Sequence, residues 1–539
     1  MKKILSFILC IIMVTSFVTI KASWEKTGWF GDGVTYHYNS ETGVFTVKGR
    51  GVATRYNNDE TGEGFTSMEY AEFMNNSWRI REVVIEEGIT ELDHSLFWRF
   101  TDISKVSLPS TLKVIDGDVF YYNKSLTEIT LPDGLEKIGG EAFSETGLTK
   151  ITLPEGLKEI GYRAFYNTPL KEVYIPKSVE KIDYLAFGSE TKTLEKIEVS
   201  PDNPNYTSLD GVLYNKDMTR IICYPSGKKD LAFTLPETVK EVGWFAFLSS
   251  NLVEININEG AEIIESSVFD FSDKLEVINM PESLKTIQGI TEVPSVKKLV
   301  IPENVVNYRG GWSETLVDTV HKGDLTKDFS CYCGRFHHHS ESFTWYNNPG
   351  SARVCQKLTD VPDVWAEAEI NKAREEGILP ESLNYGYKSR ITRAEFSELI
   401  VTLTEKAMGK ELPLAEVNFP DTHNKFVSKA KAAGIVTGRD TGLFSPGSFV
   451  TREEIAVMFL RAMDYIEKEK GLVPTEKALA IDKAYSDRDS VSPWAVTAVA
   501  TLNEKGIMKG TTNSTFNPKS TAMVEEAVIM ALRCYLLYK

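Results

Sequence analysis

Cysteine and histidine are scarce in this chain of 539 residues, with six Cys and seven His in all. Five cysteines remain once residues 1–22 are set aside as a leader, and this small, odd number excludes a framework of disulfide bonds. Beyond the leader no segment is apolar enough to span a bilayer. Acidic residues outnumber basic ones, and the net charge of −16 argues against nucleic acid or an anionic membrane surface as a partner.

The first 22 residues have the composition of a secretory signal peptide. Lys2 and Lys3 precede an apolar run over residues 4–20, and Ala22 offers a small residue for cleavage. We therefore expect a secreted protein with no stable membrane span after this segment is removed. An uncleaved anchor is the alternative, because the apolar run approaches the length needed to cross a bilayer.

Two series of residues repeat together about every 22 positions along the first half of the chain. One series comprises Ile85-Glu86, Leu108-Pro109, Leu131-Pro132, Leu153-Pro154 and Ile175-Pro176, and the other comprises Phe97, Phe120, Phe143, Phe165 and Phe187. Both resume at Leu235-Pro236 and Phe247. A fixed period of this length predicts a solenoid, in which each unit buries its apolar face only against its neighbours.

A single repeat shows how the pattern would fold. Ile151 and Leu153 alternate with a threonine, which predicts a strand with one buried face, and Pro154 closes that strand. A second short extended piece follows over Leu157–Ile160, and Phe165 then enters the next layer. We interpret these apolar residues as core, so they carry no information about a ligand.

The Phe series skips from Phe187 to Phe247, and a hairpin is predicted inside this gap, with strands on either side of residues 215–219. The repeats, the insertion beginning at Asp210 and the lead-in over residues 43–53 together resemble the leucine-rich repeats of BspA-type bacterial surface proteins. The resemblance covers residues 27–312. It implies an N-terminal β cap at 23–80, repeats at 81–312, and extracellular binding of proteins, cells or polymers.

Three of the cysteines lie in a segment, residues 313–357, that we interpret as a linker. Cys331, Cys333 and Cys355 stand close to His337, which begins a run of three histidines. A linker with a single disulfide from Cys355 to Cys331 or Cys333 is the favoured interpretation. A tetrahedral zinc site formed by Cys331, Cys333, His337 and Cys355 is the alternative, although the spacing of the first two is tighter than usual. Nothing in the segment would position a substrate for a Cys–His nucleophile.

From residue 357 onward the pattern becomes helical, and a second repeat appears. Asp360, Asp421 and Asp487 each open a unit. The first helix of each unit is predicted to end at Glu376-Gly377-Ile378, Ala433-Gly434-Ile435 or Lys505-Gly506-Ile507. A glycine followed by an apolar residue is typical of a Schellman helix end, which needs a positive φ and then a contact back onto the last turn.

These units, at 358–411, 419–471 and 485–536, resemble S-layer homology (SLH) domains. The resemblance rests on Trp365 and Trp494, on turns such as Leu443-Phe444-Ser-Pro446, and on the motifs Ile391-Thr-Arg-Ala-Glu-Phe396 and Val450-Thr-Arg-Glu-Glu-Ile455. It implies an all-α triplet packed around a pseudo-threefold axis that binds a secondary polysaccharide of the Gram-positive wall, often pyruvylated. The predicted fold class is therefore multidomain, with a β-rich leucine-rich-repeat solenoid followed by an all-α SLH triplet.

The Thr-Arg-x-Glu motif has a structural explanation for two of its residues. Thr392 with Glu395, and Thr451 with Glu454, form the pattern of a capping box at a helix start. The intervening Arg393 and Arg452 are not needed for capping, and a cation in the first turn is slightly disfavoured by the helix dipole. We therefore predicted that both arginines grip an anionic wall sugar.

Five further residues are candidates for polysaccharide binding. Trp365 and Trp494 come from the SLH resemblance, and Asp360, Asp421 and Asp487 either bond sugar hydroxyls or cap the following helix. In the third unit Val524 replaces the arginine and Met523 removes the capping hydroxyl, so we expected little binding of an anionic sugar there.

The functional hypothesis is a wall-anchored adhesion protein. Its partners would be a secondary cell-wall polysaccharide or other peptidoglycan-linked polymer, and an unidentified extracellular protein or glycan. The alternative is a structural protein of a surface lattice. The sequence lacks H-E-x-x-H, G-x-S-x-G and a phosphate-cradling glycine-rich loop, and the remaining segments are too short for a catalytic domain. We expected no enzymatic activity and no cofactor.

Overall fold

The computed structural model describes residues 25–54, 79–290, 293–305, 362–481, 485–511 and 514–539, together with short strands between 307 and 355 whose side chains are not described. The chain forms two compact units. The first contains Met1–Gly188 and Val199–Asn205, and the second contains Ser189–Glu198 and Tyr206–Lys539. The predicted signal peptide at 1–22 lies outside the described residues, as do the side chains of Cys331, Cys333, His337, Cys355 and Asp360.

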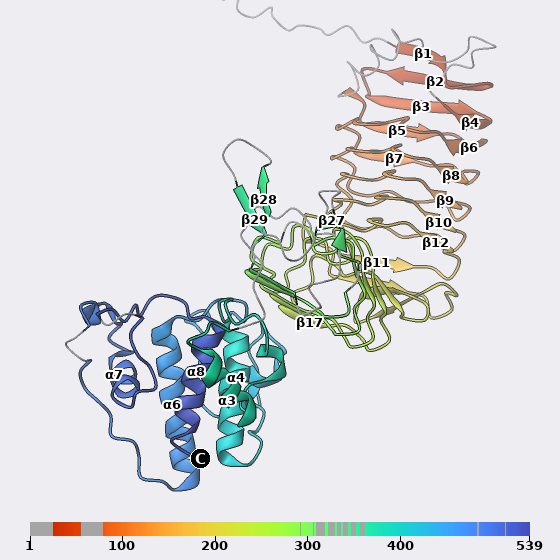
Figure 1. Ribbon diagram of the computed structural model, residues 1–539. Helices are drawn as coiled ribbons and strands as arrows, with labels where there is room; N and C mark the ends of the chain where they lie inside the picture. Colours follow the sequence, from red (N-terminus) through yellow and green to blue (C-terminus); the bar gives the residue numbers. More distant parts are fainter. Residues whose placement is uncertain are drawn as a thin grey trace, which may run out of the picture. The chain divides into compact units, whose positions relative to one another are not determined.

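The first unit begins with an antiparallel meander that turns into a parallel solenoid (Figure 1). Strands β1 (Glu25–Trp29), β2 (Val34–Asn39) and β3 (Val44–Gly49) pair antiparallel. Strand β3 then pairs in parallel with β5 (Glu82–Ile85), which pairs in parallel with β7 (Lys105–Ser107). The meander thus covers the strand edge that the first repeat would otherwise expose.

A second sheet runs along the first unit, and all its neighbouring strands are parallel. In spatial order its strands are β12 (Lys181–Ile182), β10 (Glu159–Ile160), β9 (Lys137–Ile138), β8 (Val114–Ile115), β6 (Ile89–Leu92) and β4 (Gly51–Ala53). The second extended piece predicted for each repeat is thereby confirmed. The strand predicted over Ile151–Leu153 is not regular, because only a single bond, from Thr149 N to Thr127 O at 3.2 Å, links the two chain segments there.

The phenylalanine series forms a continuous stack inside the first unit. The successive ring centroids of Phe97, Phe120, Phe143, Phe165 and Phe187 lie 5.7, 5.4, 5.5 and 5.7 Å apart, with the rings nearly parallel. Phe45 of β3 ends the stack edge-on against Phe97, at 5.8 Å. All of these rings are buried, as the repeat pattern predicted.

The segment inserted between Phe187 and Phe247 contributes the first three strands of a sheet in the second unit. Strands β14 (Tyr206–Leu209), β15 (Val212–Asn215) and β16 (Arg220–Cys223) pair antiparallel, which confirms the predicted hairpin. Parallel strands then follow in order: β18 (Glu241–Val242), β20 (Ile263–Ile264), β22 (Thr286–Ile287) and β24 (Asn307–Tyr308). Tyr224 stacks on Phe247 at 5.3 Å, so a tyrosine fills a phenylalanine position within the gap that the sequence series showed.

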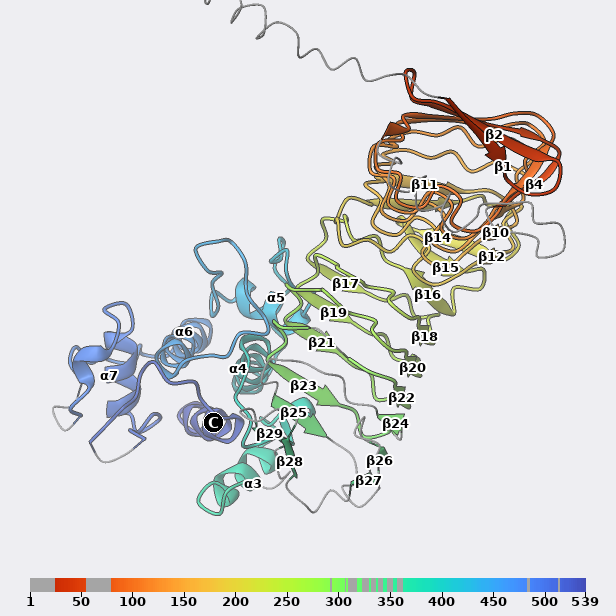
Figure 2. The same ribbon diagram turned by 90° about the horizontal axis from the view of Figure 1, so that it is seen from above.

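A separate face of the second unit is formed by the strands β17 (Ala232–Thr234), β19 (Glu254–Asn256) and β21 (Val277–Asn279), which pair in parallel (Figure 2). Strand β23 (Lys298–Ile301) pairs in parallel with β25 (Asp318–His321). The remaining strands are β11 (Glu172–Ile175), β13 (Lys196–Val199), β26 (Phe329–Ser330), β27 (Phe336–His337), β28 (Phe343–Tyr346) and β29 (Ala352–Cys355).

The C-terminal part of the second unit consists of three helix pairs. The first pair is α3 (Glu367–Glu375) and α4 (Arg393–Met408), the second is α5 (Lys425–Ala432) and α6 (Arg452–Lys470), and the third is α7 (Val496–Glu504) and α8 (Val524–Tyr535). Two short 3₁₀ turns, η2 (Glu381–Leu383) and η3 (Arg488–Ser490), lie between helices. The helices share a single hydrophobic core.

Backbone bonds close these pairs into a ring. Ile391 N donates to Ala522 O, Ala522 N to Val450 O, and Val450 N to Ile391 O, at 3.0 to 3.2 Å. Each of these residues comes just before the second helix of its pair, so the three pairs are related by a pseudo-threefold axis. The predicted fold class, a β-solenoid followed by a helical triplet, is confirmed.

The helix ends also follow the sequence prediction. Gly377, Gly434 and Gly506 have φ between 68° and 71°, and the next amide bonds back to the helix, as from Ile435 N to Ala430 O at 2.9 Å. This is the six-to-one bond of a Schellman motif. Among the described residues, no helix combines the length and apolar character that crossing a membrane requires.

Candidate functional site

Both predicted capping boxes are present. The Thr392 hydroxyl accepts the Glu395 amide at 3.2 Å, and the Glu395 carboxylate accepts the Thr392 amide at 2.8 Å. Thr451 and Glu454 repeat this arrangement at 3.4 and 2.9 Å. These residues therefore fix the start of the second helix in the first two pairs.

Arg393 and Arg452 make the same contacts, one helix pair apart. Arg393 Nε donates to Phe444 O at 2.9 Å and Nη2 to Thr437 O at 3.2 Å, while Nη1 lies 3.3 Å from Glu454 Oε1. Every one of these partners belongs to the second helix pair. Each arginine thus joins its own pair to the next one along the chain.

Arg452 reaches the third pair in the same manner. Its Nε donates to Phe516 O at 3.0 Å, its Nη2 to Lys509 O at 2.6 Å, and its Nη1 lies 3.4 Å from Glu526 Oε1. A planar guanidinium can serve these three directions at once, which an ammonium cannot.

Arg393 and Arg452 thus have anionic partners within the chain, because each meets a carboxylate and two carbonyls of the next pair. A wall sugar is therefore not needed to explain a cation in the first turn of these helices. Both side chains are almost completely buried. Burial, with Arg439 nearby, lowers the pKa of Arg393 to about 10, and burial also lowers the pKa of Arg452.

The aspartates hold turns. Asp421 is fully buried and accepts the amides of Phe444 at 2.9 Å and Ser445 at 2.7 Å. Asp487 accepts the amides of Phe516 at 2.8 Å and Asn517 at 2.7 Å. The sequence predicted that these aspartates bond sugar hydroxyls or cap a helix, and the observed bonds fit neither role. Asp421 is fully buried and therefore does not reach an external ligand.

Those turns have an unusual backbone. Ser445 has φ of 60° and Asn517 has φ of 54°, in the left-handed region, and the corresponding residue of the first pair is Gly386 at 61°. Such conformations persist where surrounding bonds impose them. Asp421 with Arg393, and Asp487 with Arg452, hold the turns of the second and third pairs.

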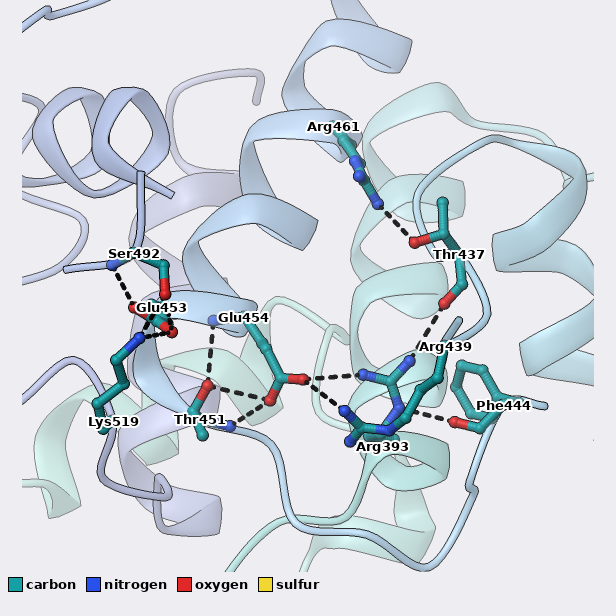
Figure 3. Close-up of polar contacts among 10 residues, drawn as sticks. All are labelled: Arg393, Thr437, Arg439, Phe444, Thr451, Glu453, Glu454, Arg461, Ser492 and Lys519. Atoms are coloured by element: carbon teal, nitrogen blue, oxygen red, sulfur yellow. Dashed lines mark hydrogen bonds and ion pairs between the residues drawn. The ribbon is translucent and has the colours of Figure 1, made fainter. Parts of the chain in front are cut away.

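Two further arginines, Arg439 and Arg461, lie close to the buried Arg393 at the boundary between the first and second helix pairs (Figure 3). Arg439 Nη1 lies 3.4 Å from the same Glu454 Oε1 that Arg393 contacts, and the Arg439 side chain is 42% exposed. Arg461 points toward Thr437 on the other side, with Nη1 to Oγ1 at 3.5 Å. Two guanidinium groups thus share the Glu454 carboxylate, and the carboxylates of Asp421 and Glu276 also act electrostatically on Arg393.

Sequence reasoning missed Arg439 and Arg461. Arg439 lies in the loop after Gly434-Ile435, outside every motif that was quoted, and the corresponding residue of the third pair is Thr511. Only the fold brings this loop to the end of Arg393. In the sequence, Arg439 differed from the repeat pattern only in that the third pair has no cation at its position.

The predicted tryptophans are exposed. Trp365 is 59% and Trp494 58% accessible, and each lies immediately before the first helix of its pair. An aromatic ring open to solvent provides a flat apolar surface with a polar edge, which suits the face of a sugar ring. In the second pair Phe426, which the sequence aligned with the tryptophans, lies inside α5 and is partly buried.

The boundary between the third and first helix pairs, which we call the third boundary, departs from the pattern as the sequence indicated. Met523 N donates to Glu526 at 2.9 Å, so half of the capping box survives without a hydroxyl. Val524 is fully buried and offers no charge at the arginine position.

A parallel β-solenoid joined to a ring of helix pairs defines a modular repeat protein. Residues 62–211 and 227–309 match the BspA type leucine rich repeat region in six copies, and residues 420–456 and 484–522 match the S-layer homology domain. The chain therefore carries BspA-type leucine-rich repeats followed by SLH domains, which point to a cell-surface or S-layer location. The first helix pair lies outside the matched residues, and the ring of backbone bonds relates it to the other two.

Individual proteins are similar either to the SLH region or to the leucine-rich repeats of this chain. An endoglucanase of Bacillus sp. (strain KSM-635) is 34% identical over 140 residues, 25% of this chain and 14% of that one, and its similarity is confined to the SLH region. A surface layer protein of Brevibacillus choshinensis is 27% identical over 137 residues, 25% of this chain and 12% of that one. This chain therefore covers only a small fraction of these relatives.

The repeats are similar to a solved leucine-rich repeat protein from Eubacterium ventriosum. The identity is 28%, the match covers 53% of this chain and 78% of that one, and the TM-score is 0.46.

Proposed function

We propose that this chain is a secreted, non-catalytic surface protein of a Gram-positive-type bacterium. The three helix pairs, each an SLH unit, hold it on the wall by binding an acidic secondary polysaccharide without a covalent bond. The solenoid then displays its repeats to extracellular protein or glycan partners. SLH domains bind cell-wall polymers.

The arrangement around Glu454 carries the proposal. Arg393 and Arg439 both contact this carboxylate, and Arg439 is exposed to solvent. A carboxylate on a wall sugar, such as a pyruvate ketal, would meet the solvent-exposed guanidinium of Arg439 there, and charge-assisted bonds to guanidinium are among the stronger hydrogen bonds in proteins. Arg393 acts in this scheme as a positioning residue, since it bonds Thr437 and Phe444 on either side of Arg439, and Arg452 holds the equivalent segments of the third pair.

Trp365 and Trp494 provide the neutral part of the site. Two exposed rings on different helix pairs allow a long polymer to be held at more than one point, and linked weak contacts raise the overall affinity. The third boundary, with Val524 in place of arginine, contributes little to an anionic ligand.

The test is co-sedimentation of the full chain with purified Gram-positive walls. We expect Arg439→Gln to lower the fraction that pellets several-fold, and Trp365→Ala with Trp494→Ala to lower it further. Lys410→Gln is the matched control, because this exposed cation pairs with Glu469 and its loss removes the same charge. Equal pelleting of Arg439→Gln and wild type would remove Arg439 from the site. If the wild type does not pellet at all, the wall-anchoring proposal is overturned.

The similarity to a surface layer protein favours a second candidate, a structural role in a surface lattice. A lattice former assembles with itself, so sedimentation velocity would show mass growing with protein concentration in the absence of walls. A monomer that pellets only with walls excludes that role.

A further inference from the structure

The ring of helix pairs departs from its threefold pattern at two adjacent positions. At one position the first pair has Ala394 where the second and third have Glu453 and Glu525. At the preceding position the third pair has Val524, where the first and second pairs have Arg393 and Arg452. Each departure leaves one boundary without a charged group that the other two boundaries possess.

The two glutamates hold the loop before the first helix of the following pair. Glu453 accepts the Ser492 amide at 3.0 Å, and Glu525 accepts the Asp363 amide at 2.9 Å. Figure 3 shows Glu453 directed at Ser492, with Lys519 beside it. Because the first pair has alanine at this position, it cannot hold the corresponding loop of the second pair.

Glu254 of β19, in the solenoid, supplies the missing carboxylate. It accepts the His423 amide at 3.2 Å and the Thr422 hydroxyl, and both donors belong to the loop of the second pair. Glu254 is fully buried, although it projects from a strand on the solenoid's surface. Removing a carboxylate from water is unfavourable unless hydrogen bonds within the protein replace those to water, as the His423 amide and the Thr422 hydroxyl do here.

Lys298 of β23 supplies the missing cation. Its Nζ lies 2.6 Å from Glu395 Oε1 and 3.4 Å from the carbonyl of Arg390, and its side chain is only 5% exposed. Glu395 is the residue that an arginine at position 524 would reach, since Glu454 and Glu526 pair with Arg393 and Arg452. The ion pair with Lys298 therefore replaces the one that Val524 cannot make.

Glu276 makes a third contact on the same face. Its Oε2 accepts the Gly447 amide at 3.2 Å, and a Cβ on Gly447 would lie 2.6 Å from the Glu276 Cβ, so only glycine allows this approach. In the parallel register of β19 and β21, Glu254 stands beside Val277, so Glu276 lies one residue before the position of Glu254 on the next turn. Glu254, Glu276 and Lys298 therefore come from three successive turns of the solenoid.

We propose that these three turns of the solenoid form a docking surface for the helical triplet of the same chain. Glu254 and Lys298 fill the two positions at which the triplet lacks a charge, and Gly447 admits Glu276 between them. The wall anchor and the displayed repeats are thereby joined by a specific interface as well as by the intervening segment of chain.

Amide hydrogen exchange of the full chain tests the proposal without any wall ligand, so its outcome is independent of the proposed function. The probes are the His423 and Gly447 amides, which donate to Glu254 and Glu276. We expect Glu254→Ala with Glu276→Ala to speed exchange at both amides about tenfold, the effect of losing one charge-assisted bond at each. Glu262→Ala is the matched control, because this exposed solenoid glutamate pairs with Lys285 and should leave both amides unchanged.

Restoring the threefold pattern provides a second test. In the Glu254→Ala background, Ala394→Glu should slow exchange at His423 back toward the wild-type rate, because the helical triplet then supplies its own carboxylate. A glutamate that acted only within the solenoid would not be replaced from position 394. Unchanged exchange at His423 and Gly447 in the first variant overturns the proposal, and that comparison stands even if Ala394→Glu fails to fold.

Discussion

Arg452 Nη1 and Glu526 Oε1 lie 3.4 Å apart, and this pair joins the second helix pair to the third. The same guanidinium bonds two backbone carbonyls, so its removal takes away the cation paired with Glu526 and a donor from each of two carbonyls. We expect Arg452→Met to reduce the stability of the helical triplet by about 2–4 kcal/mol, as for other broken buried pairs. Urea unfolding followed by far-ultraviolet circular dichroism measures the change.

Arg452→Lys should recover little of that loss, because an ammonium cannot reach all three directions. Lys410→Met, which removes an exposed ion pair, is the control and should cost less than about 1 kcal/mol. Equal effects at the two positions would show that Arg452 does not hold the boundary.

The third helix pair can be stabilised by completing its capping box. Met523→Thr adds a hydroxyl that can accept the Glu526 amide, as Thr451 does for Glu454, and Met523 is 38% exposed, so little packing is lost. We expect a gain of about 1 kcal/mol, and a similar loss for Thr451→Ala. Thermal melts of both variants should shift in opposite directions, and a fall in Met523→Thr would contradict the cap.

The phenylalanine stack makes the solenoid sensitive to a single cavity. Phe143 lies between Phe120 and Phe165 and is fully buried. Phe143→Ala should cost about 3–5 kcal/mol, and Phe143→Leu should cost much less because most of the volume is retained. The midpoint of denaturant unfolding, followed by tyrosine and tryptophan fluorescence, provides the comparison.

Asp487 makes the third helix pair sensitive to acid. Burial opposes ionisation, but the amides of Phe516 and Asn517 outweigh it and hold the pKa of Asp487 below its ordinary value of 3.8. A carboxyl whose pKa is lowered on folding contributes stability above its unfolded pKa and loses it as the pH falls through the folded pKa.

We therefore expect Asp487→Asn to be less stable than wild type at pH 7, with the difference shrinking below about pH 4. Asp489→Asn is the control, since this neighbour is 88% exposed. A constant difference across the pH range would mean that the charge of Asp487 does not matter.

The docked solenoid should also affect wall binding. Arg439 lowers the pKa of Glu276 while burial raises it more, so this carboxylate feels the cation that we assign to the wall polymer. Glu276→Gln removes a competing negative charge and should raise wall affinity about two- to fivefold in a binding isotherm. Glu262→Gln should leave it unchanged, and a weaker isotherm for Glu276→Gln would show that Glu276 does not compete for Arg439.

The sequence by itself determined the repeats, the helix caps and the helix ends. The 22-residue period placed Phe143 in a stack, and Thr451 with Glu454 specified a capping box, because local spacing alone decides whether such groups meet. The glycine before Ile435 likewise required a positive φ.

Only the tertiary structure decided the roles of the charged residues. Arg393 looked unpaired because its carboxylate and carbonyls lie more than forty residues away, and Asp421 meets its two amides only when the chain returns. Lys298 and Glu395 are separated by a long segment of chain, and no local pattern joins them. A buried charge needs partners from all directions, and a folded chain collects these from distant positions.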